Sequence, residues 1–265
     1  MNNLYDMHVH STFSHDGEDR PENLLNQAGE LGLAGVCFSE HGDYRPDLDT
    51  AGYFSCRHFS SYMSRLKKNK SGSDPEIMLG LEFSEPHIYR EDFSRICELQ
   101  LDMISGAIHW IEGVFVGEDI LLKRLSPDEI CRRYLEKVMA MVQFSGFDVL
   151  SHLCFPSRYH SQSRYPQNLL DEVLKKTINN DIVLEINTAA ADKPVSANFF
   201  PSPRVLKRYK EFGGSRVVLG SDAHSSEEVG RSFREAADCV RELGLEIGYF
   251  QNREYRSISE EAKKI

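Results

Sequence analysis

The chain has 265 residues, of which 40% are hydrophobic and 27% charged, a composition typical of a folded globular protein rather than a disordered one. Acidic residues outnumber basic ones by 41 to 31, and the net charge of −10 argues against broad binding to nucleic acid or to an anionic membrane. The length suits one α/β barrel, so we expect a single domain over residues 1–265, of undetermined oligomeric state.

The amino terminus and the cysteines indicate a cytoplasmic protein. We expect no signal peptide, because no basic segment precedes an apolar stretch, and no membrane helix, because no apolar run approaches ~18 residues. The six cysteines are scattered without a Cys-x-x-Cys pair, as in proteins that keep their thiols reduced.

Strand-like and helical patterns alternate along the chain. In order, we predict strand Leu4–Val9, helix Pro21–Leu31, strand Val36–Ser39, helix Phe54–Lys68, strand Ile77–Leu81, helix Glu91–Leu99, strand Met103–Ala107, helix Pro127–Phe144, strand Val149–Ser151, helix Gln167–Asn179, strand Ile182–Ile186, helix Pro203–Phe212, strand Val217–Gly220 and helix Ser226–Leu243. Such alternation predicts an α/β fold with a parallel sheet. No Gly-x-Gly-x-x-Gly motif follows a strand, so we predict a TIM-like barrel rather than a dinucleotide-binding fold.

Residues that commonly bind metals stand at the ends of the predicted strands. In chain order these strand-end residues are His8 and His10, His41, Glu82, His109, His152, Glu185, and Asp222 and His224. The carboxyl ends of barrel strands meet at one face, and side chains two apart on a strand point the same way. A single histidine at a strand end is more often structural, but this series predicts a site for Zn, Mn or Fe.

Several segments carry the residues of one enzyme family: Asp6-Met7-His8-Val9-His10-Ser11, Ser39-Glu40-His41-Gly42-Asp43, Gly80-Leu81-Glu82, Ser105-Gly106-Ala107-Ile108-His109, Ser151-His152, Leu184-Glu185-Ile186-Asn187-Thr188, Pro201-Ser202-Pro203 and Gly220-Ser221-Asp222-Ala223-His224. Through them the chain resembles the PHP (polymerase and histidinol phosphatase) family, specifically its monofunctional histidinol-phosphate phosphatases. The resemblance implies a distorted seven-stranded βα barrel. It also implies hydrolysis of L-histidinol phosphate to L-histidinol and phosphate, in histidine biosynthesis.

The resemblance further implies a site for three divalent transition metals. Matched motif by motif, the first metal would be held by His8, His10, Glu82 and Asp222, the second by Glu82, His109 and His152, and the third by Asp16, His41 and His224. Many relatives have a histidine where this chain has Asp16, so His15 remains the alternative third-metal ligand. A hydroxide that bridges the first two metals would attack phosphorus, with Glu82 and Asp222 as catalytic residues.

Substrate contacts are harder to place. Arg158 lies six residues after His152, and its planar guanidinium suits phosphate oxygens, so we predict that it binds the phosphate and assists catalysis, with Arg164 as the second choice. Glu185 and Asn187 are expected to bind the histidinol portion or to orient a metal-bound histidine. Lys193 is the nearest cation after Thr188 and the last predicted substrate contact. Asp43 is expected to support a ligand, and Trp110 to pack near the mouth of the site.

Other functions share part of this pattern. A PHP nuclease or nucleotide phosphatase would use the same metals but would need a basic track, which the charge of −10 disfavours. A non-catalytic PHP module would not need a complete ligand set. An amidohydrolase-like barrel would be expected to carry a lysine at a strand end. The sequence therefore favours a small phosphate monoester as substrate.

Overall fold

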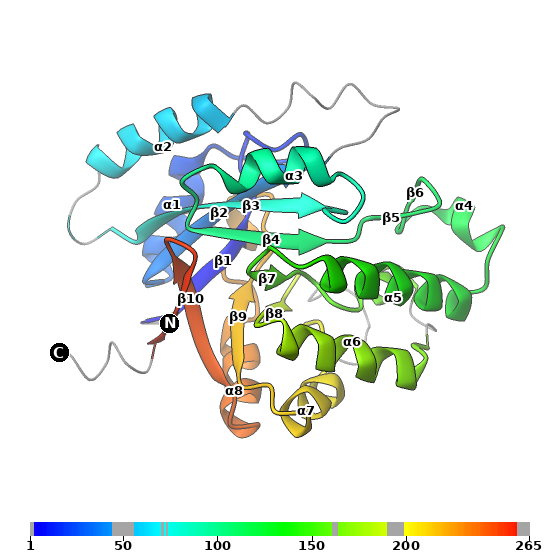
Figure 1. Cartoon of the computed structure of the whole chain (residues 1–265). Helices are drawn as coiled ribbons and strands as arrows, with labels where there is room; N and C mark the ends of the chain where they lie inside the picture. Colours follow the sequence, from blue (N-terminus) through cyan, green and yellow to red (C-terminus); the bar gives the residue numbers. More distant parts are fainter. Residues whose placement is uncertain are drawn as a thin grey trace.

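The computed structural model describes residues 3–43, 56–69, 72, 74–160, 164–189 and 199–258. Figure 1 shows the elements, which are β1 (Tyr5–Val9), α1 (Pro21–Glu30), β2 (Gly35–Gly42), α2 (Cys56–Asn69), β3 (Glu76–Ser84), α3 (Arg90–Cys97), β4 (Met103–Ala107), β5 (Trp110–Ile111), β6 (Val114–Phe115), α4 (Asp119–Leu122), α5 (Pro127–Phe144), β7 (Val149–Leu150), η2 (Phe155–Arg158), α6 (Gln167–Asn179), β8 (Val183–Asn187), α7 (Pro203–Glu211), β9 (Arg216–Gly220), η3 (Ser226–Glu228), α8 (Phe233–Glu242), β10 (Glu246–Gln251) and β11 (Glu254–Ser257). Each predicted strand and helix has a counterpart.

The central sheet is mainly parallel, which confirms the predicted α/β class, but it is not a closed seven-stranded barrel. Among the described residues it has nine strands, in the order β1-β2-β3-β4-β7-β8-β9-β10-β11, with only β11 antiparallel to its neighbour. Strand β10 pairs with the edge of β9 to which β1 would have to pair if the sheet closed into a barrel. Strand β1 shifts register between Asp6 and Val9, and it reaches the chain beyond β9 through one bridge, between Val9 and Ala223.

Near the beginnings of the strands, the side chains that pack between neighbouring strands are mainly apolar. A buried cluster combines Tyr5, Met7, Cys37, Met78, Met103, Val149, Val183 and Val218 with Tyr249 and Phe250 of β10. The rings of Tyr5 and Tyr249 stack with centroids 3.9 Å apart. Because apolar residues occupy the amino ends of the strands, the polar residues of the sheet gather at the carboxyl ends.

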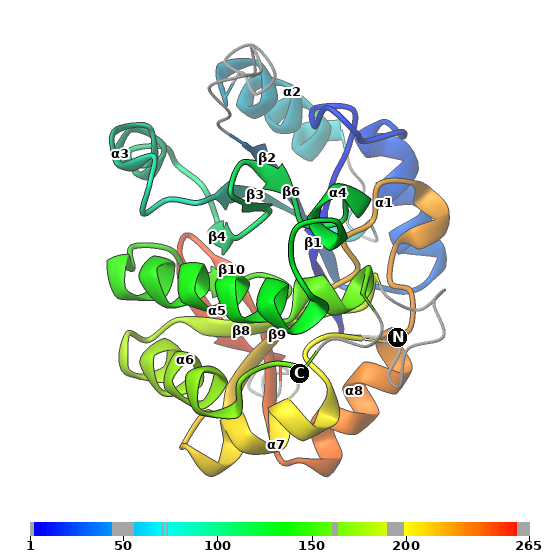
Figure 2. The same ribbon diagram turned by 90° about the vertical axis from the view of Figure 1, so that its right-hand side faces the viewer.

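The helices surround the strands (Figure 2). Helix α5 begins as the sequence predicts, because the Ser126 hydroxyl accepts a hydrogen bond from the Glu129 N–H at 3.2 Å and Pro127 occupies the first turn. The predicted helix Ser226–Leu243 is instead a 3-10 turn, η3, followed by α8. The chain between them takes positive φ at Gly230 and Ser232, which a continuous α-helix does not allow.

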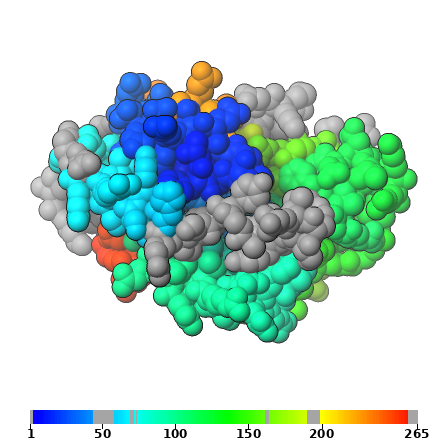
Figure 3. Space-filling view, turned by 90° about the horizontal axis from the view of Figure 1, so that it is seen from above, coloured from blue at the N-terminus to red at the C-terminus, as the bar shows by residue number. Residues whose placement is uncertain are grey.

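No helix in the described part of the chain is both long and apolar enough to cross a membrane. Seen from above, the amino-terminal residues (blue) occupy the middle of one face, between the cyan segment around α2 and the green segment around α4 and α5 (Figure 3).

Candidate metal centre

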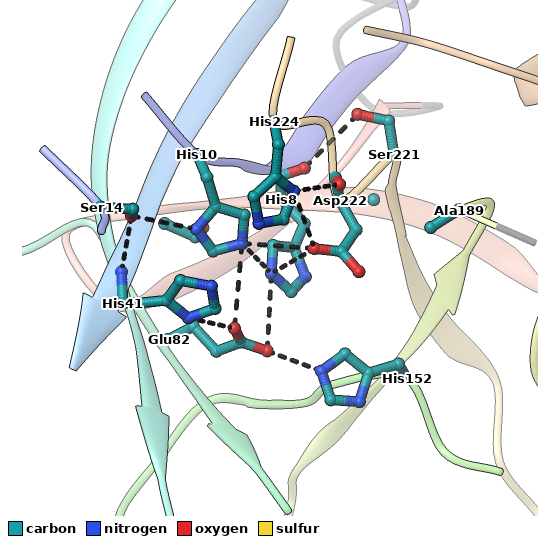
Figure 4. Close-up of polar contacts among 12 residues, drawn as sticks. His8, His10, Ser14, His41, Glu82, His152, Ala189, Ser221, Asp222 and His224 are labelled. Atoms are coloured by element: carbon teal, nitrogen blue, oxygen red, sulfur yellow. Dashed lines mark hydrogen bonds and ion pairs between the residues drawn. The ribbon is translucent and has the colours of Figure 1, made fainter. Parts of the chain in front are cut away.

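The strand ends bring eight of the nine predicted ligands to one place, and the loop after β1 adds Asp16. His8 lies in β1 and His10 directly after it, His41 lies near the end of β2, and Glu82 lies in β3. Residues just beyond β4, β7 and β9 supply His109, His152, Asp222 and His224. Figure 4 shows imidazoles and carboxylates from these separate strands turned toward a common centre.

The first cluster contains His8, His10, Glu82 and Asp222. The Nε2 atoms of His8 and His10 are 2.9 Å apart, and Asp222 Oδ1 lies 3.3 Å from His10 Nε2. Glu82 Oε1 is 3.5 Å from His8 Nε2. Two imidazole nitrogens so close repel one another unless a proton or a metal cation lies between them, so this geometry fits a cation.

Glu82 also belongs to the second cluster. Its Oε1 lies 2.7 Å from His152 Nε2 and 3.6 Å from His109 Nε2, and the two histidine nitrogens are 3.3 Å apart. Burial would raise the pKa of Glu82, but His8, His109 and His152 hold it well below its usual range. Glu82 is thus an ionised carboxylate that the two clusters share.

The third cluster is formed around Asp16. Its Oδ2 lies 3.4 Å from His41 Nε2 and 3.3 Å from His224 Nε2. The His15 side chain is about as exposed as that of Asp16, at 44% against 43%, and its Nε2 is 3.7 Å from the same Asp16 oxygen, farther than the two histidines that Asp16 joins. The geometry favours Asp16 over His15 as the ligand at this position.

Burial would lower the pKa of His8, His41, His109 and His224, but the carboxylates around them raise it above its usual value, whereas His10 differs. Burial lowers the pKa of His10 well below its usual value, and the neighbouring His41 and His224 lower it further. A neutral imidazole keeps the lone pair that a metal requires. The ligand set of imidazole nitrogens and carboxylate oxygens suits a divalent transition metal.

Further carboxylates hold the histidines from behind. Glu185 Oε1 is 2.5 Å from His8 Nδ1, while its Oε2 accepts the His152 N–H at 2.6 Å. Asp43 Oδ1 lies 3.2 Å from His109 Nδ1, as expected of a supporting residue. Such partners fix ring orientation and tautomer. Gly220 allows Glu185 this position, since a Cβ there would stand 2.2 Å from Glu185 Oε1.

Backbone strain coincides with the centre. His152 has φ of 28° and Asp222 has φ of 54°, in the left-handed region that non-glycine residues rarely adopt. Strain of this kind is typical of functional sites, where the surrounding fold holds a residue in place. Here it re-aims two side chains immediately after their strands end.

The centre opens into a cavity of about 650 Å³. The cavity is lined by His15, Asp16, Glu18, His41, Asp43, Glu82, His109, Trp110, Phe115, Glu118, His152, Phe155, Arg158, Tyr159, Asp222, His224, Ser225 and Glu228. The expected position of Trp110 near the mouth is therefore confirmed. The cavity has room for a small ester between the ligands and its outer wall.

Among the predicted substrate contacts that the structure describes, only Arg158 lines this cavity. Its Nη1 donates to Asp222 Oδ2 at 2.9 Å, and its side chain is 24% exposed. Glu185 and Asn187 are buried beneath His8 and His152, which favours the orienting alternative for them. Arg164 borders a different pocket beside Asp128, and Lys193 lies outside the described residues.

Comparison with known proteins agrees with this geometry. The PHP domain model matches residues 6–189. The chain belongs to the PHP domain family. A probable histidinol-phosphatase of Clostridium acetobutylicum is 28% identical over 258 residues, which cover 94% of this chain and 98% of the relative. The histidinol-phosphatase of Lactococcus lactis subsp. lactis is 26% identical over 251 residues, 91% of each chain.

Solved structures show the same fold. The histidinol phosphate phosphatase of Lactococcus lactis, crystallised with zinc, L-histidinol and phosphate, superposes with a TM-score of 0.84 at 25% identity, covering 97% of this chain and 100% of the other. A histidinol phosphatase structure from Listeria monocytogenes superposes at 0.74 with 19% identity, covering 87% of this chain and 99% of the other, and supports the fold.

The aromatic wall of this PHP domain was missed in the sequence. Phe155 packs against His152 at a centroid distance of 4.4 Å, and Phe115 and Tyr159 continue the wall outward at 6.0 and 5.4 Å from Phe155. Phe115 is in the short β5–β6 hairpin, whose turn has positive φ at Glu112 and Gly113. A residue followed by glycine between two apolar pairs was the available signal.

Proposed function

We propose that the protein hydrolyses L-histidinol phosphate to L-histidinol and phosphate with bound divalent cations, as a cytoplasmic step of histidine biosynthesis. The observation that carries the proposal is the convergence of nine ligand-type side chains: seven line one cavity beside a guanidinium, and the buried His8 and His10 contact Glu82 and Asp222 of that lining. The Lactococcus relative, named for this reaction and crystallised with zinc, histidinol and phosphate, supports it.

The ligands would hold three cations. His8, His10, Glu82 and Asp222 would hold the first, Glu82, His109 and His152 the second, and Asp16, His41 and His224 the third. Zn, Mn or Fe suits these nitrogen and oxygen donors. Bound there, such cations would supply an activated water and positive charge for the phosphate.

The residues of the chain would then divide the remaining work. Arg158 lies at the edge of the first cluster, where its guanidinium would bind a phosphate oxygen through two N–H groups. Glu185 and Asp43 would keep His8 and His109 oriented. These contacts would hold the metal ligands in place before the substrate binds, so that the site need not rearrange during the reaction.

The aromatic wall would receive the leaving group. The imidazole of histidinol can stack on Phe115 or Tyr159, which stand at 5.7 Å from one another with an interplanar angle of 74°. Glu18 and Glu118 also line the cavity, and a carboxylate suits the ammonium group of histidinol. These contacts distinguish a cationic, aromatic leaving group from a sugar or a polynucleotide.

The test compares kcat/KM of the metal-loaded protein for L-histidinol phosphate, p-nitrophenyl phosphate and a nucleotide monophosphate. We expect the highest value for L-histidinol phosphate, and loss of turnover of all three esters in Glu82→Gln, whose carboxylate is shared by two clusters. Faster turnover of the nucleotide, or of single-stranded DNA, would move the protein to another branch of the family.

A further inference from the structure

A buried hydrogen-bond chain runs behind His10, on the side away from the cavity. It consists of Glu40, which precedes the ligand His41 in β2, and Ser14, in the loop that carries Asp16. Glu40 is fully buried and Ser14 is 6% exposed. Figure 4 shows Ser14 joined to the His10 ring and to the backbone nitrogen of His41, on the far side of the His10 ring from Glu82.

The Ser14 hydroxyl has three partners but only one proton. Its Oγ is 2.6 Å from Glu40 Oε2, 3.0 Å from the backbone N of His41 and 3.3 Å from His10 Nδ1. A backbone N–H can only donate, so Ser14 accepts from His41. The hydroxyl proton is donated over the short contact to Glu40 Oε2, an oxygen that also accepts the Ser11 backbone N–H at 3.1 Å.

Ser14 must therefore accept from His10 as well. That requires the proton of the neutral His10 ring to be on Nδ1, which leaves the Nε2 lone pair facing His8 and Asp222. Glu40 thus determines the His10 tautomer through one hydroxyl, whereas Glu185 contacts the His8 ring directly.

The same carboxylate fastens the loop. Ser11 donates to Glu40 from its backbone N at 3.1 Å and from its Oγ at 2.6 Å, and Ser14 N–H donates to the Ser11 carbonyl at 2.8 Å. Gly17 packs so closely on this turn that a Cβ would stand 1.9 Å from the Ser11 carbonyl oxygen. Asp16 therefore lies in the loop between two fixed points, the Ser14 contacts and the close packing of Gly17.

We propose that Ser14 and Glu40 are positioning residues, which fix the metal-binding tautomer of His10 and hold the loop that presents Asp16. The proposal rests on the metal centre of the proposed function. Ser11 offers a matched control, because its buried hydroxyl makes a contact of the same length to Glu40 and does not reach His10, while the backbone N–H that also ties the loop to Glu40 is kept in Ser11→Ala.

The test measures zinc affinity by chelator competition in wild type, Ser14→Ala and Ser11→Ala. Loss of a residue that orients a metal-bound histidine typically weakens metal binding by about 10- to 100-fold, so we expect that loss in Ser14→Ala and less than about threefold in Ser11→Ala. Equal affinities in the two variants, whether both unchanged or both reduced, would overturn the assigned role of Ser14.

A second measurement does not depend on the variants folding. Long-range ¹H–¹⁵N spectra of the zinc-loaded wild-type protein, with histidines labelled and assigned, should show His10 coordinated through Nε2 and protonated on Nδ1. Coordination through Nδ1 would overturn the role assigned to the hydrogen-bond chain from Glu40 through Ser14 to His10. If the wild-type protein binds no zinc, the proposed metal centre fails. The tautomer of His10 in that same protein still tests the hydrogen-bond chain, which requires the proton on Nδ1.

Discussion

Replacement of Arg158 by alanine tests the proposed phosphate contact. Arg158 Nη1 lies 2.9 Å from Asp222 Oδ2, and the other oxygen of that carboxylate faces His10 in the first cluster. A phosphate bound at this cluster therefore comes within reach of the guanidinium. A charge-assisted contact of this kind is typically worth about 1.5–3 kcal/mol. Because each 1.4 kcal/mol is a factor of about ten, kcat/KM for L-histidinol phosphate should fall about ten- to a hundredfold in Arg158→Ala.

The assay is steady-state phosphate release by protein of known metal content, and Arg164→Ala is the matched control. Arg164 lies six residues further on but borders the pocket beside Asp128, so its loss should leave kcat/KM unchanged. Arg158→Lys should recover little of the activity if the planar guanidinium matters. Wild-type kcat/KM in Arg158→Ala, with unchanged metal content, would refute the assignment and redirect the search to Lys193.

Three further changes test other parts of the site. Asp16→Asn should lose one bound metal equivalent and at least about a hundredfold in rate, because a cation stabilises transition-state charge by several kcal/mol. His15→Ala should have a mild effect on both. Elemental analysis and turnover would show the reverse pattern if His15 is the ligand. Glu185→Gln should weaken metal binding about 10- to 100-fold in chelator competition, and unchanged affinity would argue against an orienting role. Phe115→Ala should raise KM for L-histidinol phosphate about two- to tenfold, but not KM for glycerol phosphate, because aromatic pairing contributes about 0.5–1.5 kcal/mol; equal changes for both esters would exclude stacking.

Most of the metal centre was predictable from the sequence because strand periodicity locates strand ends, and strand ends of a parallel sheet converge. His8 and Asp222 could thus be placed together although more than two hundred residues separate them. The single-domain assignment and the metal roles stay predictions. The family motifs were needed for Asp16, since it lies in a loop rather than at a strand end.

Other features depend on tertiary packing that a single sequence does not reveal. Strands β10 and β11 cover the edge of the sheet next to β9, so the expected seven-stranded barrel does not close as a ladder. Glu185 was predicted at the correct strand end, but only the burial of β8 places it under His8 instead of in the cavity. Phe115 reaches the site from a hairpin whose strands have two residues each, too few to show a strand period.

The most direct test of the metal-dependent phosphatase is phosphate release from L-histidinol phosphate as metal is returned to chelated protein. We expect no turnover in the chelated protein. Activity should then rise as Zn, Mn or Fe is added, until up to three equivalents are bound. Full turnover in the presence of excess chelator, or less than one equivalent bound after reconstitution, would contradict it.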